Sequence, residues 1–147
     1  MIRKAGTSDL ESIRRCACAA YRKYLARIGR KPAPMVADFA AAIKNENLYV
    51  LTDDERIQGF VVFYPRGDHM HLENVAVDPE YQGSGHGFSL IEFAEQAAKS
   101  AGYDRVELYT NAKMTENLEF YRRLGYQAFE RKIEDGFDRV YFRKALS

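Results

Sequence analysis

The stretch HLENVAVDPEYQGSGHGFSLI, residues 71–91, decides the fold of this chain. Its first part is apolar and β-branched up to Val77, which predicts a strand, and Asp78-Pro79-Glu80 ends that strand. Apolar residues recur at helical spacing from Phe88 onward. The glycine-rich turn between strand and helix exposes backbone N–H groups, and its glycines let an anion approach the main chain. The stretch therefore predicts a binding site for a diphosphate.

The glycine-rich turn has two other interpretations. A dinucleotide-binding turn has the pattern Gly-x-Gly-x-x-Gly and belongs to a parallel βαβ unit near the start of a larger sheet. Gly83, Gly85 and Gly87 are spaced two apart, so they do not fit that pattern. A turn that only reverses the chain does not need three glycines in five residues, which disfavours the second alternative.

Composition limits the class of protein. The chain has 147 residues, of which 46% are hydrophobic and 29% charged, so we expect one domain spanning residues 1–147. With 22 Lys and Arg against 21 Asp and Glu, it lacks the basic surface of a nucleic-acid binder, and we expect a small ligand. The N-terminus lacks the apolar core of a signal peptide, and no apolar run approaches the ~20 residues that span a bilayer. These features predict a cytoplasmic protein without a membrane partner.

Predicted strands and helices surround the central stretch. Ser8 and Glu11 form a capping box that starts a helix ending near Gly29. Cys16 and Cys18 lie two apart in this helix, so their side chains diverge and neither a disulfide nor a metal pair is favoured. The other predicted elements are strands at 2–5, 48–52, 59–64, 106–110, 126–133 and 137–143, helices at 36–43 and 115–124, and a hairpin turn at 53–56. This order predicts a mixed α/β fold with an antiparallel front half.

Two segments resemble the GNAT superfamily of acyl-CoA-dependent N-acetyltransferases. Val75 to Gly87 is similar to the family's Arg/Gln-x-x-Gly-x-Gly/Ala signature with its preceding strand, and Phe120 to Tyr126 is similar to its closing helix and tyrosine. Together with the order of elements, the resemblance covers nearly the whole chain. It implies a GNAT-like α/β (α+β) fold, with a mixed, mostly antiparallel sheet of about seven strands, about four helices, and a central strand that splays from the next.

The resemblance implies acetyl-CoA as a cosubstrate and no metal. The loop's backbone N–H groups would hold the CoA pyrophosphate, helped by the helix dipole. The residues concerned are Gln82, Gly83, Ser84, Gly85, His86, Gly87 and Phe88. The exposed backbone of Val75, Ala76 and Val77 would pair with the pantetheine arm as a further strand would.

Tyr121 is the first candidate catalytic residue that the resemblance implies. A thiolate expelled from a thioester gains from a nearby proton donor, and a neutral phenol with a pKa near ~10 can supply the proton. Asn117 lies one helical turn earlier on the same face, within range of the cofactor arm. The alternative is that Tyr121 only packs in the core beside Leu118 and Leu124.

Glu73 is the second candidate catalytic residue. It alternates with His71 and Val75 along the strand, so its carboxylate is expected on the face of the pantetheine-contacting segment. There it could deprotonate the acceptor amine. The alternative is an exposed strand carboxylate paired with Arg or Lys. His69, His71 and Glu73 could also suggest a metal face, but strand alternation alone produces such trios.

One position departs from the family pattern. Many relatives carry an asparagine seven places before the closing tyrosine, where this chain has Met114, with Asn111 and Asn117 on either side. The acceptor is expected across the cofactor sulfur, against the first two helices and their connection. Candidate residues there are Tyr21, Tyr24, Arg27, Arg30 and Met35.

These motifs leave three hypotheses for function. The leading one is an N-acetyltransferase that moves an acetyl group from acetyl-CoA to a primary amine of a small molecule by direct attack. The second is a protein acetyltransferase acting on an N-terminus or a lysine, and the third is a non-catalytic acyl-CoA-binding module. A closed acceptor pocket would favour the first and a wide acidic groove the second. Homodimer formation is compatible with all three.

Overall fold

The computed structural model describes residues 1–54 and 56–147, so Glu55, within the predicted turn at 53–56, lies outside the described residues. In the described part, the strands are β1 (Ile2–Lys4), β2 (Leu48–Asp53), β3 (Arg56–Arg66), β4 (His69–Val77), β5 (Arg105–Asn111), β6 (Gln127–Glu134) and β7 (Phe137–Ala145). The helices are α1 (Leu10–Tyr21), α2 (Leu25–Ile28), α3 (Phe39–Lys44), α4 (His86–Ser100) and α5 (Thr115–Arg123). Short 3-10 turns are η1 (Thr7–Asp9), η2 (Arg22–Tyr24), η3 (Ala33–Val36) and η4 (Pro79–Tyr81). Every strand that the sequence predicts is present.

The strands form a seven-stranded sheet in the order β1-β2-β3-β4-β5-β7-β6. Strands β1 to β4 pair with their neighbours in antiparallel fashion. β4 and β5 run parallel, and β7 lies antiparallel to both β5 and β6. The prediction of a mixed, mostly antiparallel sheet is therefore confirmed.

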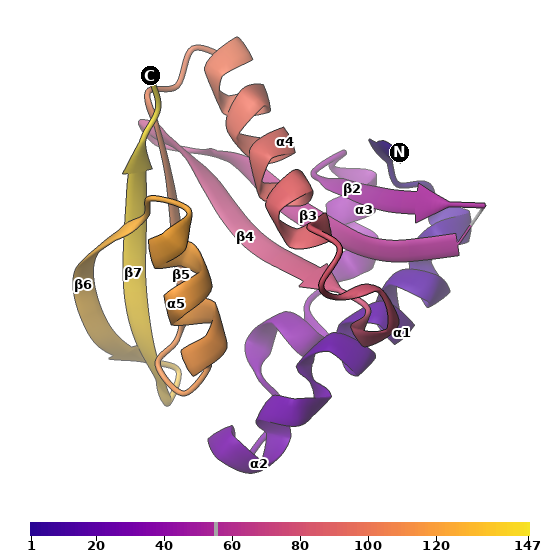
Figure 1. The fold of residues 1–147 in the computed structure, drawn as a ribbon, viewed down its shortest axis with the longest axis horizontal. Coiled ribbons are helices and arrows are strands. Elements are labelled where there is room, and N and C mark those ends of the chain that lie inside the picture. The colour runs from indigo at the N-terminus through magenta and orange to yellow at the C-terminus, as the bar shows by residue number, and fades with distance from the viewer. Residues whose placement is uncertain (55) are drawn as a thin grey trace.

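The sheet opens between β4 and β5, as Figure 1 shows. Within the described residues, only Met70 with Val106 and His71 with Glu107 pair across these two strands, although β4 continues to Val77. Beyond His71 the second edge of β4 has no strand beside it. The expected splay of the central strand is confirmed, and among the described residues it leaves this edge of β4 without a strand partner, with side chains of Tyr21 and Gln82 donating to the Val75 and Val77 carbonyls.

Helices cover both faces of the sheet (Figure 1). α1 and α3 pack on one face in a core cluster that includes Phe60 and Val62 of β3. α4 and α5 pack on the other face in a second cluster that includes Val61 and Phe63. The alternation along β3 follows from the period of two in a strand, and burial of both faces explains its continuous apolar run.

The first helix differs from its prediction. The chain forms η1, α1, η2 and α2 in place of one continuous helix, and Gly29 closes α2 with φ of +84°. The capping box of Ser8 and Glu11 is wrong, because the Gly6 N–H donates to Asp9 Oδ2 at 2.8 Å in its place. Arg3 holds Asp9 in this position through a two-pronged ion pair, which sequence spacing alone does not reveal.

The second helix starts later than predicted. Residues 33–36 form η3, and α3 begins only at Phe39. Asp38 explains the separation, because its carboxylate accepts a hydrogen bond from the Ala41 N–H at 3.0 Å and caps α3. Among the described residues, no helix has both the length and the apolar character needed to cross a bilayer.

Candidate active site

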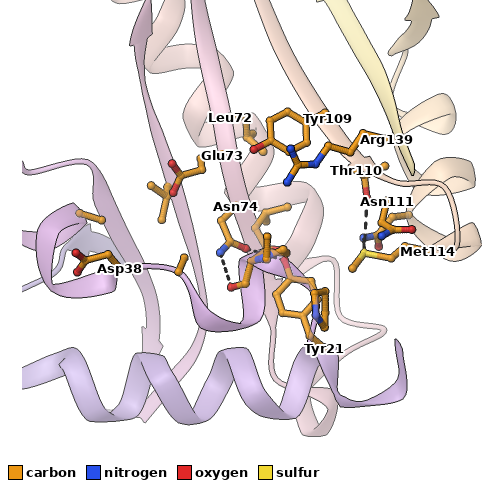
Figure 2. A pocket seen from close by; sticks show the side chains of 18 of the residues that line it. Tyr21, Asp38, Leu72, Glu73, Asn74, Tyr109, Thr110, Asn111, Met114 and Arg139 are labelled. Carbon is orange, nitrogen blue, oxygen red and sulfur yellow. Dashed lines mark hydrogen bonds between the residues drawn. The ribbon is translucent and has the colours of Figure 1, made fainter. Parts of the chain in front are cut away.

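A cavity of about 570 Å³ lies where β4 and β5 separate. Its walls come from residues 72–75 of β4, residues 109–111 of β5, α5, and the segment 32–47 that carries η3 and α3. Figure 2 shows the lining side chains reaching into this space from both sides of the splay. The part of the cavity lined by Glu73, Tyr109 and Arg139 is the candidate acceptor end.

A β-bulge in β4 sets the direction of two lining side chains. Val62 pairs with Asn74 and Phe63 with Leu72, so Glu73 is an extra residue without a partner on β3. Glu73 and Asn74 therefore both face the cavity, although they are neighbours in sequence. The expected alternation of Glu73 with Val75 is wrong across the bulge, because Val75 packs toward the cluster under α4 and α5.

Glu73 is held by Tyr64. The Tyr64 hydroxyl donates to Glu73 Oε1 at 2.9 Å, so the carboxylate is paired with a phenol rather than with the Arg or Lys of the alternative interpretation. Burial and this hydrogen bond raise the pKa of Tyr64 to about 12. At neutral pH Tyr64 therefore remains a donor, and Glu73 keeps free lone pairs that can accept a proton from a ligand.

Asn74 joins the helices to β4. The Tyr21 hydroxyl donates to Asn74 Oδ1 at 2.7 Å and to the Val75 carbonyl at 3.0 Å. Asn74 Nδ2 donates to the Pro34 carbonyl at 3.0 Å. Asn74 is 3% exposed and hydrogen-bonded through both its Oδ1 and its Nδ2, which makes it a fixed part of the wall. Sequence reasoning missed this residue, although one amide inside the apolar run 72–77 was an available signal.

Tyr121 of α5 lines the cavity and is 5% exposed. Its ring packs against Tyr126 and Phe142, at centroid distances of 5.9 and 6.0 Å. Burial, with a smaller effect of nearby Tyr24, raises the pKa of Tyr121 above its ordinary value, so the phenol is neutral at pH 7. Tyr121 therefore packs in the aromatic core and also lines the cavity, so the packing interpretation does not conflict with a catalytic role.

The loop after β4 has the properties of an anion site. Gly83 and Gly85 have φ of +88° and +79°, a conformation that glycine adopts without strain. In the part of the chain that the structure describes, the backbone N–H groups from Gly83 to Phe88 donate to no acceptor. They precede or begin α4, where the helix dipole favours an anion. A diphosphate fits this set of donors.

Gly87 has a second reason to be glycine. A Cβ atom there would lie 3.2 Å from Cζ of Phe120, so the missing side chain lets α4 approach α5. Asn117 also lies on α5 and lines the cavity, with its Nδ2 3.6 Å from Met114 Sδ. Met114 itself is 2% exposed, so at this position the chain has a buried thioether beside the cavity wall.

The acceptor candidates from sequence are only partly brought together. Tyr21 lines the cavity, but the other four candidates do not. Tyr24 and Met35 are buried in the core under α1. Arg27 instead forms an ion pair with Glu116 of α5, at 2.5 and 3.0 Å, and Arg30 lies over the Phe137 ring at 3.7 Å. Their placement in the acceptor wall is wrong, because the two arginines find partners outside the cavity and the other two side chains are buried in the core.

The trio of His69, His71 and Glu73 does not converge. His69 pairs with Asp68 and Glu107, while Glu73 turns toward Tyr64. His71 is 4% exposed and lies between aromatic rings, and burial lowers its pKa to about 4, so it is neutral. Among the described residues, no three potential metal ligands are grouped.

Comparison with known proteins identifies the family. The model of the acetyltransferase (GNAT) family matches residues 11–126. The chain belongs to this family. GNAT proteins use acetyl-CoA, which agrees with the loop and the splayed strands, and the dinucleotide interpretation is excluded. A Rossmann fold has a mostly parallel sheet, whereas β1 to β4 of the described sheet pair in antiparallel fashion.

Individual relatives resemble this GNAT chain to different extents. Glucosamine 6-phosphate N-acetyltransferase of Trypanosoma brucei brucei is 40% identical over 63 residues, which cover 43% of this chain and 41% of that protein. A GNAT-family protein of Desulfovibrio desulfuricans superposes with a TM-score of 0.80 at 20% identity, covering 100% of this chain and 99% of that one. PaiA N-acetyltransferase of Thermoplasma acidophilum, in complex with coenzyme A, gives 0.76 at 19% identity, covering 99% and 98%. The chain spans less than half the length of the curated relatives it matches.

Proposed function

We propose that this GNAT chain, acting as one domain, is an N-acetyltransferase that moves an acetyl group from acetyl-CoA to a primary amine of a small molecule by direct attack. The observation that carries the proposal is the cavity beside the splayed strands, which is lined by both Tyr121 and Glu73. A proton donor and a proton acceptor thus face one space next to a free strand edge.

The loop after β4 and the edge of β4 would bind different parts of acetyl-CoA. The N–H groups from Gly83 to Phe88 would hold the pyrophosphate at the start of α4, whereas the Gln82 N–H donates to the Pro79 carbonyl at 3.4 Å. The backbone of Val75, Ala76 and Val77 would pair with the pantetheine amides, because β5 does not cover this edge of β4. Asn117 would contact the arm from α5, since it lines the cavity one helical turn before Tyr121.

The reaction needs two proton transfers. Acetyl-CoA supplies the activated carbonyl carbon; the amine nitrogen bonds to that carbon while the carbon–sulfur bond breaks. Tyr121 donates its hydroxyl proton to the departing sulfur and regains one from solvent. Glu73 accepts the proton that the amine loses, and the Tyr64 hydroxyl keeps the carboxylate in place.

A small amine fits this cavity better than a protein segment does. The segment 32–47 and the Tyr21–Asn74–Pro34 hydrogen bonds form a wall on the acceptor side. A protein substrate would need a groove that an extended chain can enter. The experiment must distinguish this function from the two alternatives, a protein acetyltransferase and a non-catalytic acyl-CoA-binding module.

The test measures binding and turnover on the same protein. Saturating acetyl-CoA should raise the melting temperature, because it binds only the native state, whereas NAD should leave it unchanged. A panel of primary amines and of peptides with free N-termini or lysines is then assayed for thiol release. Thiol release with small amines supports the proposal, and release only with peptides supports the protein alternative. Binding without release from any acceptor supports the non-catalytic module.

A further inference from the structure

The acceptor end of the cavity contains a guanidinium with unused hydrogen bonds. Arg139 of β7 lies opposite Asn111 of β5 and is the cationic side chain among the described lining residues. Its side chain is 11% exposed. Figure 2 shows it beside Tyr109, reaching toward the space that Glu73 faces from β4.

The surroundings of Arg139 fix its plane and pair its charge with two carboxylates through Nη1, but none of its N–H groups makes a close hydrogen bond to them. The guanidinium carbon lies 4.5 Å from the centre of the Tyr109 ring and 5.5 Å from that of Phe137. Its nearest carboxylate oxygens, on Glu134 and Asp135, are 3.6 and 3.9 Å from Nη1, beyond hydrogen-bond length. In the described residues, Arg139 donates no side-chain hydrogen bond.

The donors of Arg139 are accessible from the cavity. Among the described residues, no side-chain nitrogen of Arg139 is a buried atom without a partner, so its N–H groups are open to water and to a ligand. Arg131 on β6 shows the bonded case, with two contacts to Asp138 at 3.0 and 2.7 Å. Glu134, the closer carboxylate to Arg139, accepts a hydrogen bond from the Tyr141 hydroxyl. The free donors of Arg139 thus match an acceptor that enters the cavity.

The two walls of the cavity carry opposite charges. On the β4 side, Glu73 offers a carboxylate to the amine, and on the β7 side Arg139 offers a planar pair of donors. The carboxylate of Asp38, which also lines the cavity, is engaged as the cap of α3. A molecule with an amine at one end and an anion at the other would satisfy both walls.

We propose that the acceptor of this enzyme is a primary amine that also carries a carboxylate or phosphate group, and that Arg139 binds this anion. The inference rests on the proposed N-acetyltransferase function and specifies its substrate class. Arg139 is a specificity residue: it holds the anion with paired N–H donors and so positions the amine beside Glu73 and the reacting carbon.

The first experiment uses the unmodified protein and matched acceptors. Amino alcohols, amino acids and O-phosphorylated amino alcohols with two to six carbons between the groups are compared at saturating acetyl-CoA. We expect kcat/KM to be about 10- to 100-fold higher for the best anionic acceptor than for its neutral partner, since one charge-assisted contact contributes that much. The carboxylate and phosphate series show which anion is preferred.

Variants then assign the preference to Arg139. Arg139→Gln should raise KM for anionic acceptors about 10- to 100-fold and leave neutral acceptors within about twofold. Arg139→Lys should recover part of the preference, because it keeps the charge but loses the paired donors. Arg143→Gln is the control, since Arg143 lies on the same strand and stacks on Phe129 outside the cavity.

Each outcome separates this inference from the function on which it rests. Equal kcat/KM for anionic and neutral acceptors overturns the role of Arg139 but leaves the acetyltransferase intact. A preference that persists in Arg139→Gln assigns the anion to another group and also overturns it. Failure of every amine to release thiol overturns the proposed function. If Arg139→Gln does not fold, the acceptor series and Arg139→Lys still decide.

Discussion

Glu73 and Asn74 show at the scale of single residues what the sequence can and cannot predict. The sequence shows both side chains, and Glu73 was a candidate base because it was expected to alternate with Val75 along the strand. Their common direction depends on the bulge opposite Val62 and Phe63, which is a property of pairing with β3. A strand taken alone alternates, so the contact between Glu73 and Tyr64 could not be predicted.

Tyr121 gives the clearest prediction at this scale. Tyr121→Phe removes one hydroxyl and keeps the ring that packs against Tyr126 and Phe142, so the fold and the affinity for acetyl-CoA should be retained. The rate of acetyl transfer should fall by about 100-fold or less, because water partly replaces the proton donor. Single-turnover thiol release across pH measures the step.

Tyr126→Phe is the matched control for Tyr121→Phe. It removes a hydroxyl that donates to Glu95 at 2.8 Å, in the same aromatic cluster but outside the cavity lining. Its transfer rate should equal that of the parent. Equal rates for the parent and the Tyr121 variant at every pH would assign Tyr121 to packing alone.

His71 predicts how stability depends on pH. Burial lowers its pKa from 6.5 to about 4, so protonation favours the unfolded chain. The stability that its neutral form provides is present above pH 6.5 and is lost as the pH falls toward 4. Relative to His71→Leu, the parent should lose on the order of 2–3 kcal/mol of unfolding free energy between pH 7 and pH 4.

Urea unfolding at pH 7, 5.5 and 4 tests the role of His71. The parent and His71→Leu should converge or cross as the pH falls, since only the parent buries an imidazole that gains a proton on unfolding. Parallel stability curves for the parent and His71→Leu would mean that His71 charges in the folded protein.

At the scale of elements, local signals predicted the loop better than the first helix. Glycines, a strand end and a helix start lie within a few residues of each other, so the sequence indicates the turn directly. The first helix changes to a 3-10 turn after Tyr21, where the Tyr21 hydroxyl bonds to Asn74 and Val75 of β4. Helical periodicity continues to Ile28, so the sequence did not indicate this change.

The loop predicts a selective loss of cosubstrate binding. Gly85→Val places a β-branched residue at φ of +79°, so the loop must shift and its N–H groups lose their common direction. The Kd for acetyl-CoA should rise about 10- to 100-fold, as expected for one lost charge-assisted contact. Calorimetric titration of acetyl-CoA measures this change.

Gly67→Val is the control for strain in the loop. Gly67 has φ of +68° in the turn between β3 and β4, with open space around it, so the backbone strain is similar. This variant should lose a similar amount of stability and retain the Kd of the parent. If Gly85→Val binds acetyl-CoA as tightly as Gly67→Val does, the phosphates are held elsewhere.

At the scale of the whole molecule, two motifs were enough to predict the family, but not the acceptor wall. The motifs at 75–87 and 120–126 are separated by α4 and β5, and their order is typical of one fold. Arg139 reaches the cavity only because β7 inserts between β5 and β6 and brings residue 139 beside Asn111. The sequence of a C-terminal strand does not show whether the strand lies at the edge of a sheet or between two others. The position of Arg139 beside the cavity was therefore not predicted.

β4 and β5 pair over a short length, so the two halves of the sheet diverge from this point. Among the described residues, β4 and β5 pair only at Met70 and His71, so farther along the two halves are joined by side-chain packing and by contacts such as the Arg27–Glu116 ion pair. That bridge is nearly half exposed on both sides, and dissolved ions screen such pairs. Dissolved salt should therefore weaken this contact between α2 and α5, whereas a ligand that pairs with β4 beyond His71 would supply the main-chain contacts that β5 does not make.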